Sequence, residues 1–170
     1  MTAQASRRLF FALWPDETIQ QRLADVAREL AHEAQGKPIS WHNIHATLAF
    51  LGDVADGAVS ELTKLADERG DFFCALTLDR VSSFPQGVVY AAPTESPREL
   101  LKLAADLHRA LRERGYPIER RPFVPHVTLV RNARRPPESS AISPITWPVR
   151  GVHLVQSELR SAGAFYRLVD

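Results

Sequence analysis

His45-Ala46-Thr47-Leu48 recurs later in the chain as His126-Val127-Thr128-Leu129. Each copy lies in a run rich in apolar and β-branched residues, which predicts a β-strand. Residues two apart on a strand point to the same face, so the histidine and threonine of each copy share one face while the residues between them face the core. Two such strands can place two imidazoles and two hydroxyls on the walls of one cleft. A single copy would be an ordinary strand, whereas the repetition favours a shared purpose.

This set of side chains suits the cleavage of a phosphodiester. In-line displacement at phosphorus needs a base to activate the attacking oxygen and an acid to protonate the leaving oxygen, and imidazole, with a pKa of about 6.5, can do either. A threonine hydroxyl can donate to a non-bridging phosphate oxygen. We therefore predict that His45 and His126 are catalytic and that Thr47 and Thr128 bind the substrate. These residues alone leave open which histidine is the acid and which is the base.

Over the whole chain, hydrophobic periodicity and turn residues predict about seven strands and three helices. The predicted strands cover residues 8–13, 44–51, 72–81, 88–91, 125–131, 149–155 and 164–169, and the predicted helices cover 19–30, 59–66 and 100–111, with a loop at 134–140. The last strands follow one another without helices between them, which favours an α+β fold with largely antiparallel sheets. The repeated motif also suggests two pseudo-symmetric lobes, within a single domain of residues 1–170.

The composition is that of an ordinary globular protein, with 170 residues of which 45% are hydrophobic. The single cysteine, Cys74, excludes an intrachain disulfide and lies in an apolar run, so we expect a buried structural thiol in a reducing compartment. The polar segment Met1–Arg8 and the short apolar run after it do not have the form of a signal peptide, and no stretch is long enough to span a membrane. We therefore expect a cytoplasmic protein with no membrane segment.

The segments around both motifs extend the pattern over nearly the whole chain. The sequence resembles the two-histidine (2H) phosphoesterases, and among them the RNA 2′,3′-cyclic phosphodiesterases, also called 2′-5′ RNA ligases or LigT-like proteins. The likeness is carried by Arg8–Leu13, Asn43–Gly52, Arg121–Arg131, Ser157-Glu158-Leu159 and Tyr166. Paired His-x-Thr-x motifs about eighty residues apart are specific, and no motif position departs from the family pattern.

The resemblance implies a fold and a reaction. The fold would be bilobal, with antiparallel sheets facing a central cleft and helices outside. The reaction would be hydrolysis of an RNA 2′,3′-cyclic phosphate end to a 2′-phosphomonoester, together with the reverse joining of such an end to a 5′-hydroxyl through a 2′-5′ bond. By motif, His45 would be the proton donor and His126 the proton acceptor, while Thr47 and Thr128 would hold the phosphate. No metal and no cofactor are implied.

Two other functions stay open. One keeps the chemistry and changes the substrate to a small cyclic nucleotide, for example a cyclic phosphate on an ADP-ribose-type molecule. The other is a non-catalytic RNA-binding module, although binding alone needs no acid and no base. In each case we expect a monomer whose partner is an RNA end or a small nucleotide.

Several further residues are candidates for the cleft. Arg131 ends the second motif strand, but on a regular strand it points away from His126, so it reaches the cleft only at a bulge or at the strand end. We include it as a third substrate-binding residue, with a structural ion pair as the alternative. Phe10, Phe11 and Phe84 could stack on a nucleobase, but core positions are expected for them.

The remaining histidines point to no second site. His42, His45 and His126 could in principle hold a metal, but the parity of His42 is wrong for a regular strand and acidic ligands at matching spacing are missing, so we predict no metal site. His32 and His108 fall on predicted helices, where we expect them to be solvated.

The charge is unevenly distributed along the chain. The net formal charge is only +1, which argues against broad electrostatic coating of nucleic acid, but residues 98–135 carry 10 positive and 4 negative groups. We read this basic segment, with Arg120, Arg121, Arg134 and Arg135, as a margin for one phosphate-bearing end. Neutralising these four arginines is expected to weaken RNA substrates and to lower the salt dependence.

Overall fold

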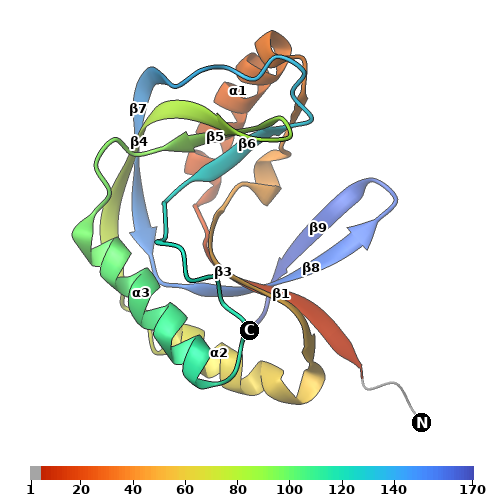
Figure 1. The fold of residues 1–170 in the computed structure, drawn as a ribbon, viewed down its shortest axis with the longest axis vertical. Coiled ribbons are helices and arrows are strands. Elements are labelled where there is room, and N and C mark those ends of the chain that lie inside the picture. The colour runs from red at the N-terminus through yellow and green to blue at the C-terminus, as the bar shows by residue number, and fades with distance from the viewer. Residues whose placement is uncertain (1–4) are drawn as a thin grey trace.

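The strands form two sheets in the computed structural model, which describes residues 5–170 (Figure 1). One sheet has four strands in the order β3-β1-β8-β9, and the other has five in the order β2-β6-β5-β4-β7. The elements are β1 Ser6–Leu13, α1 Glu17–Ala34, β2 Lys37–Pro38, β3 Ala46–Ala55, α2 Val59–Asp67, β4 Phe73–Phe84, β5 Val88–Ala92, α3 Arg98–Glu113, β6 Val127–Arg131, β7 Ser140–Arg150, β8 His153–Arg160 and β9 Gly163–Leu168, with short 3₁₀ turns at Trp41–Asn43 and Asp56–Ala58.

The predicted α+β class with antiparallel sheets is confirmed, since every strand pairing is antiparallel. Helix α1 packs against β6 and β7 of the five-stranded sheet, whereas α2 and α3 pack near β8 and β3 of the four-stranded sheet. Figure 1 accordingly shows α1 at one end of the molecule and α2 with α3 at the other. Because α1 follows β1 but packs on the other sheet, the sheets do not correspond to the two halves of the chain. The division into two pseudo-symmetric lobes stays a prediction, supported by one motif copy in each sheet.

Strand β1 shows how the sequence separates the core from the cleft. Leu9, Phe11 and Leu13 are fully buried in the main hydrophobic cluster. Phe10 and Ala12 alternate with them and belong to a separate small cluster with Val155. The period of two residues along a strand therefore assigns the two adjacent phenylalanines to opposite faces of the four-stranded sheet.

The C-terminal strands differ from the prediction. Strand β7 already begins at Ser140, where a loop was expected, and the predicted strand 149–155 contains the turn at Gly151 between β7 and β8. Pro144 and Pro148 made 140–148 unlike a strand, but β7 is an edge strand, where proline is tolerated because a backbone donor can be missing. Gly151 has φ +64°, a conformation that glycine adopts at no steric cost. The two-residue strand β2 was also missed.

Two local predictions can be checked directly. Asp16 caps α1, since its Oδ1 accepts the backbone N–H of Ile19 at 2.9 Å. Cys74 is buried in the main cluster, and burial raises the pKa of its thiol to about 11, which fits an inert structural residue. None of the helices within residues 5–170 has both the length and the apolar character needed to cross a membrane. Residues 1–4 of the polar N-terminal segment lie outside the described residues.

Candidate active site

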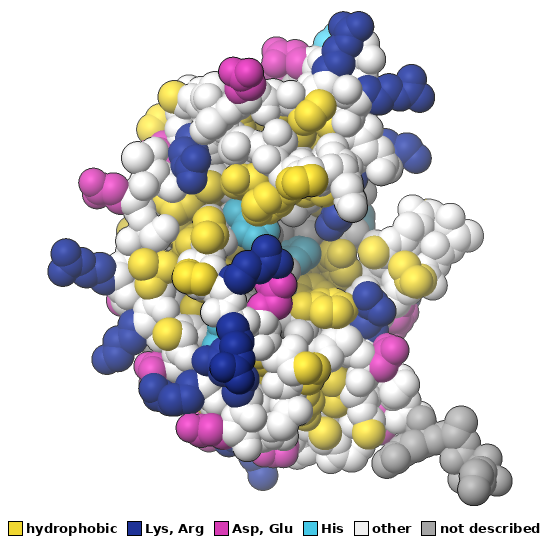
Figure 2. Space-filling model, viewed as in Figure 1, with side chains coloured by type: hydrophobic (Ala, Val, Ile, Leu, Met, Phe, Trp, Pro, Cys, Tyr) yellow, Lys and Arg dark blue, Asp and Glu magenta, His cyan; other side chains and the backbone are white. Residues whose placement is uncertain are grey.

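A cleft of about 770 Å³ is lined by residues from both sheets and from the segment between β2 and β3. Figure 2 shows histidine side chains inside the hollow in the middle of this face. The lining contains four cationic side chains, of Arg8, Lys37, Arg131 and Arg160, and none of its described residues is acidic. The cleft therefore offers a positive environment that favours an anionic ligand such as a phosphate. All predicted site residues line it, namely His45, Thr47, His126, Thr128 and Arg131.

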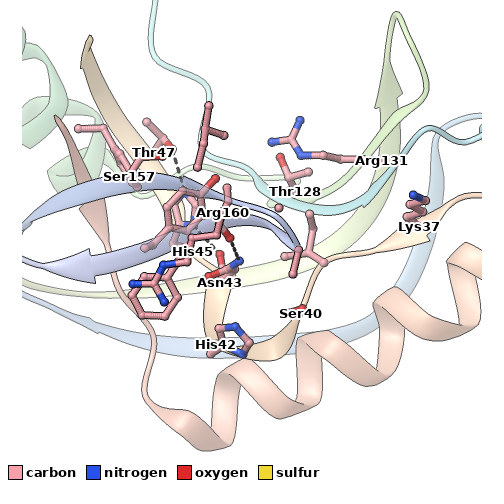
Figure 3. A pocket seen from close by; sticks show the side chains of 18 of the residues that line it. Lys37, Ser40, His42, Asn43, His45, Thr47, Thr128, Arg131, Ser157 and Arg160 are labelled. Carbon is pink, nitrogen blue, oxygen red and sulfur yellow. Dashed lines mark hydrogen bonds between the residues drawn. The ribbon is translucent and has the colours of Figure 1, made fainter. Parts of the chain in front are cut away.

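His45 lies directly before β3 and is enclosed by aromatic rings. Its Nδ1 is 2.6 Å from the backbone carbonyl oxygen of Asn43, which can only accept, so Nδ1 carries the proton in neutral imidazole. Its Nε2 is then the basic atom, and it lies 3.1 Å from Oγ1 of Thr47 (Figure 3). Trp14 stacks on the imidazole with ring centroids 5.4 Å apart, while Tyr166 meets it edge-on at 5.1 Å. These contacts fix the ring and its tautomer.

His126 repeats this arrangement directly before β6. Its Nδ1 donates to the backbone carbonyl of Val124, 2.8 Å away and two residues earlier, as Nδ1 of His45 does to Asn43. The rings of Phe84 and Tyr90 pack edge-on against it, at centroid distances of 5.1 and 5.5 Å. Both histidines thus keep Nε2 free of the backbone, as an acid or a base must.

The predicted faces of the motif strands are confirmed. Ala46 and Leu48 are buried, as are Val127 and Leu129, whereas each motif histidine and threonine is partly exposed and lines the cleft. The strands begin two residues later than expected, at Ala46 and Val127, so each histidine directly precedes its strand. Figure 3 shows Thr128 and Arg131 side by side on their strand, across from the pair His45 and Thr47.

Each motif strand has a bulge at its leucine. The pairing of β1 with β3 skips Leu48, and the pairing of β5 with β6 skips Leu129. An extra residue reverses the alternation of faces beyond it. Consequently Arg131 returns to the face of His126, and Phe50, at the corresponding position of the first motif, returns to the face of His45; both line the cleft. Arg131 was expected to reach the cleft only at a bulge or at a strand end. It lies both beyond a bulge and at the last residue of β6.

His108 was expected to be solvated, and this prediction was wrong. Its Nε2 lies 2.7 Å from the backbone carbonyl oxygen of Leu48, to which it donates from α3. Leu48 is the residue left out of the strand pairing, so its carbonyl needs another donor. His108 therefore ties α3 to the bulge that follows Thr47.

Burial dominates the electrostatics of His45. The pKa of its imidazole is lowered from the ordinary 6.5 to about 4, chiefly because burial removes the ring from water. The bond to the Asn43 carbonyl opposes this shift, while the neighbouring Arg131 and His126 contribute smaller lowering effects. A pKa below the working pH means that the neutral form prevails. His45 is therefore uncharged at pH 7 in this structure.

This charge state can be measured by NMR titration of the imidazole nitrogens. We expect the empty enzyme to show a His45 pKa of about 4. Arg131→Gln should raise that pKa, because a positive charge that opposes protonation is removed. Arg135→Gln, which changes an arginine outside the cleft lining, should leave it unchanged. A His45 resonance that titrates near 6.5 in the wild type would contradict this description.

Other lining residues were not found from the sequence. Asn43 supplies the carbonyl for His45, and its side-chain Nδ2 donates to the carbonyl of Ala164 at 2.9 Å, which ties the first motif to β9. Arg8 shares its strand face with Phe10, so the same parity that places Phe10 at the cleft could have identified it. Lys37 and Arg160 gave no sequence signal, because their strands approach the cleft only in the folded chain.

The three phenylalanines considered for base stacking lie in different surroundings, and so does His42, which was considered as a metal ligand. Phe10 lines the cleft and contacts the His45 ring at 5.1 Å, whereas Phe11 is a core residue and Phe84 packs on His126. His42 lies on the cleft wall, edge-on to Trp41. Within residues 5–170 no three His, Cys, Asp or Glu side chains are grouped as metal ligands.

Comparisons with known proteins agree with this geometry. The family model of the 2′-5′ RNA ligase superfamily matches residues 14–160. The RNA 2′,3′-cyclic phosphodiesterase of Escherichia coli K12 is 36% identical over 129 residues, which cover 75% of this chain and 73% of the relative. A solved structure described as a phosphoesterase has a TM-score of 0.84 at 29% identity and covers 98% of this chain and 97% of its own.

A second solved structure, of E. coli LigT with 3′-AMP, has a TM-score of 0.81 at 28% identity, with 98% of this chain and 96% of the other covered. The likeness extends over both sheets and is not confined to the motifs. The resemblance drawn from the paired motifs is therefore confirmed. The chain belongs to the 2′-5′ RNA ligase superfamily.

Proposed function

We propose that this protein hydrolyses the 2′,3′-cyclic phosphate end of an RNA to a 2′-phosphomonoester. The observation that carries the proposal is the pair of histidines in one cationic cleft, each with Nδ1 held by a backbone carbonyl and with no backbone partner on Nε2. The E. coli relative is named for this activity. The cleft has room for a nucleotide and its phosphate, and the name of the relative favours an RNA end as the substrate.

In this mechanism His126 accepts a proton from water as the water oxygen attacks phosphorus. The bond from phosphorus to the 3′ oxygen breaks, and His45 donates its Nε2 proton to that oxygen. The hydroxyls of Thr47 and Thr128 and the guanidinium of Arg131 hold the non-bridging oxygens, where charge accumulates in the transition state. No metal or cofactor takes part. Run backwards with a 5′-hydroxyl in place of water, the same two groups would join RNA ends through a 2′-5′ bond.

The low pKa of His45 fits a proton donor only if the substrate changes it. Without a phosphate beside it the imidazole is neutral at pH 7, because burial lowers its pKa to about 4. A phosphate anion beside Nε2 stabilises the imidazolium and so raises the pKa of His45. The hydroxyl of Thr47 donates to Nε2 of the neutral imidazole. Once Nε2 is protonated, this hydroxyl can donate to the phosphate instead. His45 thus acquires its proton together with the substrate.

The test of this function is a hydrolysis assay with RNA that ends in a 2′,3′-cyclic phosphate, in excess EDTA. The expected product is the 2′-phosphate, identified by mass and by phosphate position. A small cyclic phosphate of the ADP-ribose type, assayed in parallel, tests the alternative substrate. Binding of RNA with no change in its cyclic end after long incubation would favour the non-catalytic module. Loss of activity in EDTA would overturn the metal-free mechanism.

We further propose a monomeric, single-domain protein of the cytoplasm. The chain crosses repeatedly from one sheet to the other, so neither sheet is formed by a continuous part of the sequence. Residues 1–170 are therefore expected to fold as one unit. A lone, buried cysteine fits a reducing compartment. Light scattering and one cooperative unfolding transition, seen by two probes, test the first two points.

A further inference from the structure

A smaller hollow of about 300 Å³ lies between α3 and the segment that joins α3 to β6. One wall is a single face of α3, because Leu101, Ala105, His108 and Arg112 recur three or four residues apart. The other wall is residues 120–123. We call this hollow the outer groove.

The walls of the outer groove are held in place by packing and hydrogen bonding. Its loop wall is anchored on both sides by buried residues, Ile118 and Pro125. Phe123 packs edge-on to His108, with ring centroids 6.4 Å apart, and Arg112 Nη1 donates to the backbone carbonyl of Glu119 at 3.5 Å. The loop therefore holds a fixed position against α3.

The chemistry of the outer groove is cationic and apolar. Arg112, Arg120 and Arg121 are exposed along it, and Leu101 and Phe123 supply apolar surface. No described residue of its lining is acidic. Proteins that bind single-stranded nucleic acid without sequence preference combine positive side chains, which follow the phosphate backbone, with aromatic side chains, on which the bases stack.

The groove is close to the catalytic cleft along the chain. Arg121 precedes His126 by five residues, which extend over at most about 18 Å. Figure 2 shows Lys and Arg side chains gathered in the middle of the face, next to the hollow that contains histidines. A cyclic phosphate occupies the 3′ end of an RNA, so the rest of the strand can leave the cleft only in the 5′ direction.

We propose that the outer groove binds the sugar–phosphate backbone of the RNA substrate on the 5′ side of its cyclic end. The proposal rests on the proposed function. It divides the basic segment 98–135: Arg131 acts in the cleft, and Arg120 and Arg121 act in the groove. The backbone N–H groups of Arg134 and Arg135 instead bond the carbonyls of Gln35 and Ala34 at the end of α1, away from α3.

The experiment compares two substrates, a 2′,3′-cyclic mononucleotide and a hexaribonucleotide with the same cyclic end. For the double variant Arg120→Gln/Arg121→Gln we expect kcat/KM on the hexanucleotide to fall about tenfold and kcat/KM on the mononucleotide to stay unchanged. Loss of two phosphate contacts makes the salt slope shallower by about 1.4. Between 50 and 200 mM salt the wild type should thus lose about sevenfold more hexanucleotide activity than the variant does.

A second variant should act in the opposite direction. Glu119 pairs with Arg121 at 2.7 Å, so Glu119→Gln frees that guanidinium and should raise hexanucleotide kcat/KM. The matched control, Arg22→Gln/Arg28→Gln, removes the same charge from the exposed side of α1 and should change neither substrate. If Arg120→Gln/Arg121→Gln lowers kcat/KM equally on both substrates, or does not lower it on the hexanucleotide, the proposed role of the outer groove is wrong.

Binding separates this proposal from the proposed function. Fluorescence anisotropy of the hexanucleotide on His126→Ala protein needs no turnover. If the wild type opens neither the hexanucleotide nor the mononucleotide, the proposed function fails. The groove is then judged by whether Arg120→Gln/Arg121→Gln, in the His126→Ala background, still weakens binding about tenfold.

Discussion

His126→Ala is expected to lower kcat for opening a 2′,3′-cyclic phosphate by about 10²- to 10⁴-fold, the usual contribution of a positioned general acid or base. The Val124 carbonyl and two aromatic rings hold the imidazole in place, so its removal takes away a positioned Nε2. His45→Ala should cause a loss of the same order. KM should change much less than kcat, because the proposed mechanism assigns phosphate binding to the threonines and Arg131, which the variant keeps. The measurement is a steady-state assay on a cyclic mononucleotide.

The double variant His45→Ala/His126→Ala gives a further check. Residues that act together in one step do not have additive effects, so the double loss should be well below the product of the single losses. His32→Ala, on the exposed side of α1, is the control and should keep wild-type rates. Full activity in either single variant would exclude the two-histidine mechanism.

Phe11→Ala is expected to lower the free energy of unfolding by about 3–5 kcal/mol. Phe11 is fully buried in the main cluster, on the strand that lies between β3 and β8 in the four-stranded sheet. Its removal leaves a cavity where neighbouring strands cannot close in. Domains of this kind are stable by about 5–15 kcal/mol, so the urea midpoint should drop sharply at constant m-value.

The neighbouring residue supplies the matched control. Phe10 faces the cleft, and its ring lies 5.1 Å from that of His45 and 5.3 Å from that of Tyr166. Phe10→Leu should cost less than about 1.5 kcal/mol, because an apolar side chain remains. It should instead raise the pKa of His45, since water reaches the imidazole more easily. A stability loss as large as that of Phe11→Ala would show that the faces of β1 are not distinct.

The sequence predicted the parts of the site that depend on local geometry. The period of two residues placed His45, Thr47, His126 and Thr128 on the cleft faces, because strand alternation needs no knowledge of the rest of the chain. The helices followed from their apolar spacing and from the cap at Asp16. The repeated motif then connected two distant segments, which no local rule does.

What the sequence missed depends on how the strands pair. The bulges at Leu48 and Leu129 exist only in the register with β1 and β5, and they decide the faces of Phe50 and Arg131. His108 was misassigned because its partner, the carbonyl at Leu48, is left free by that same register. Strand β7 was missed because its prolines forbid a central strand, while its edge position became known only from the sheet order.

The two bulges also give the cleft a polarity. Two equivalent motifs with equivalent histidines would accept a cyclic phosphate in either of two opposite orientations. At the first position beyond each bulge on the cleft side, however, one strand carries the aromatic ring of Phe50 and the other the guanidinium of Arg131. A substrate with an anionic side and an uncharged side meets different partners in the two orientations, so their energies differ. One residue after each bulge thus makes the two ends of a near-symmetric pair of imidazoles chemically different, which the proposed division into an acid and a base requires.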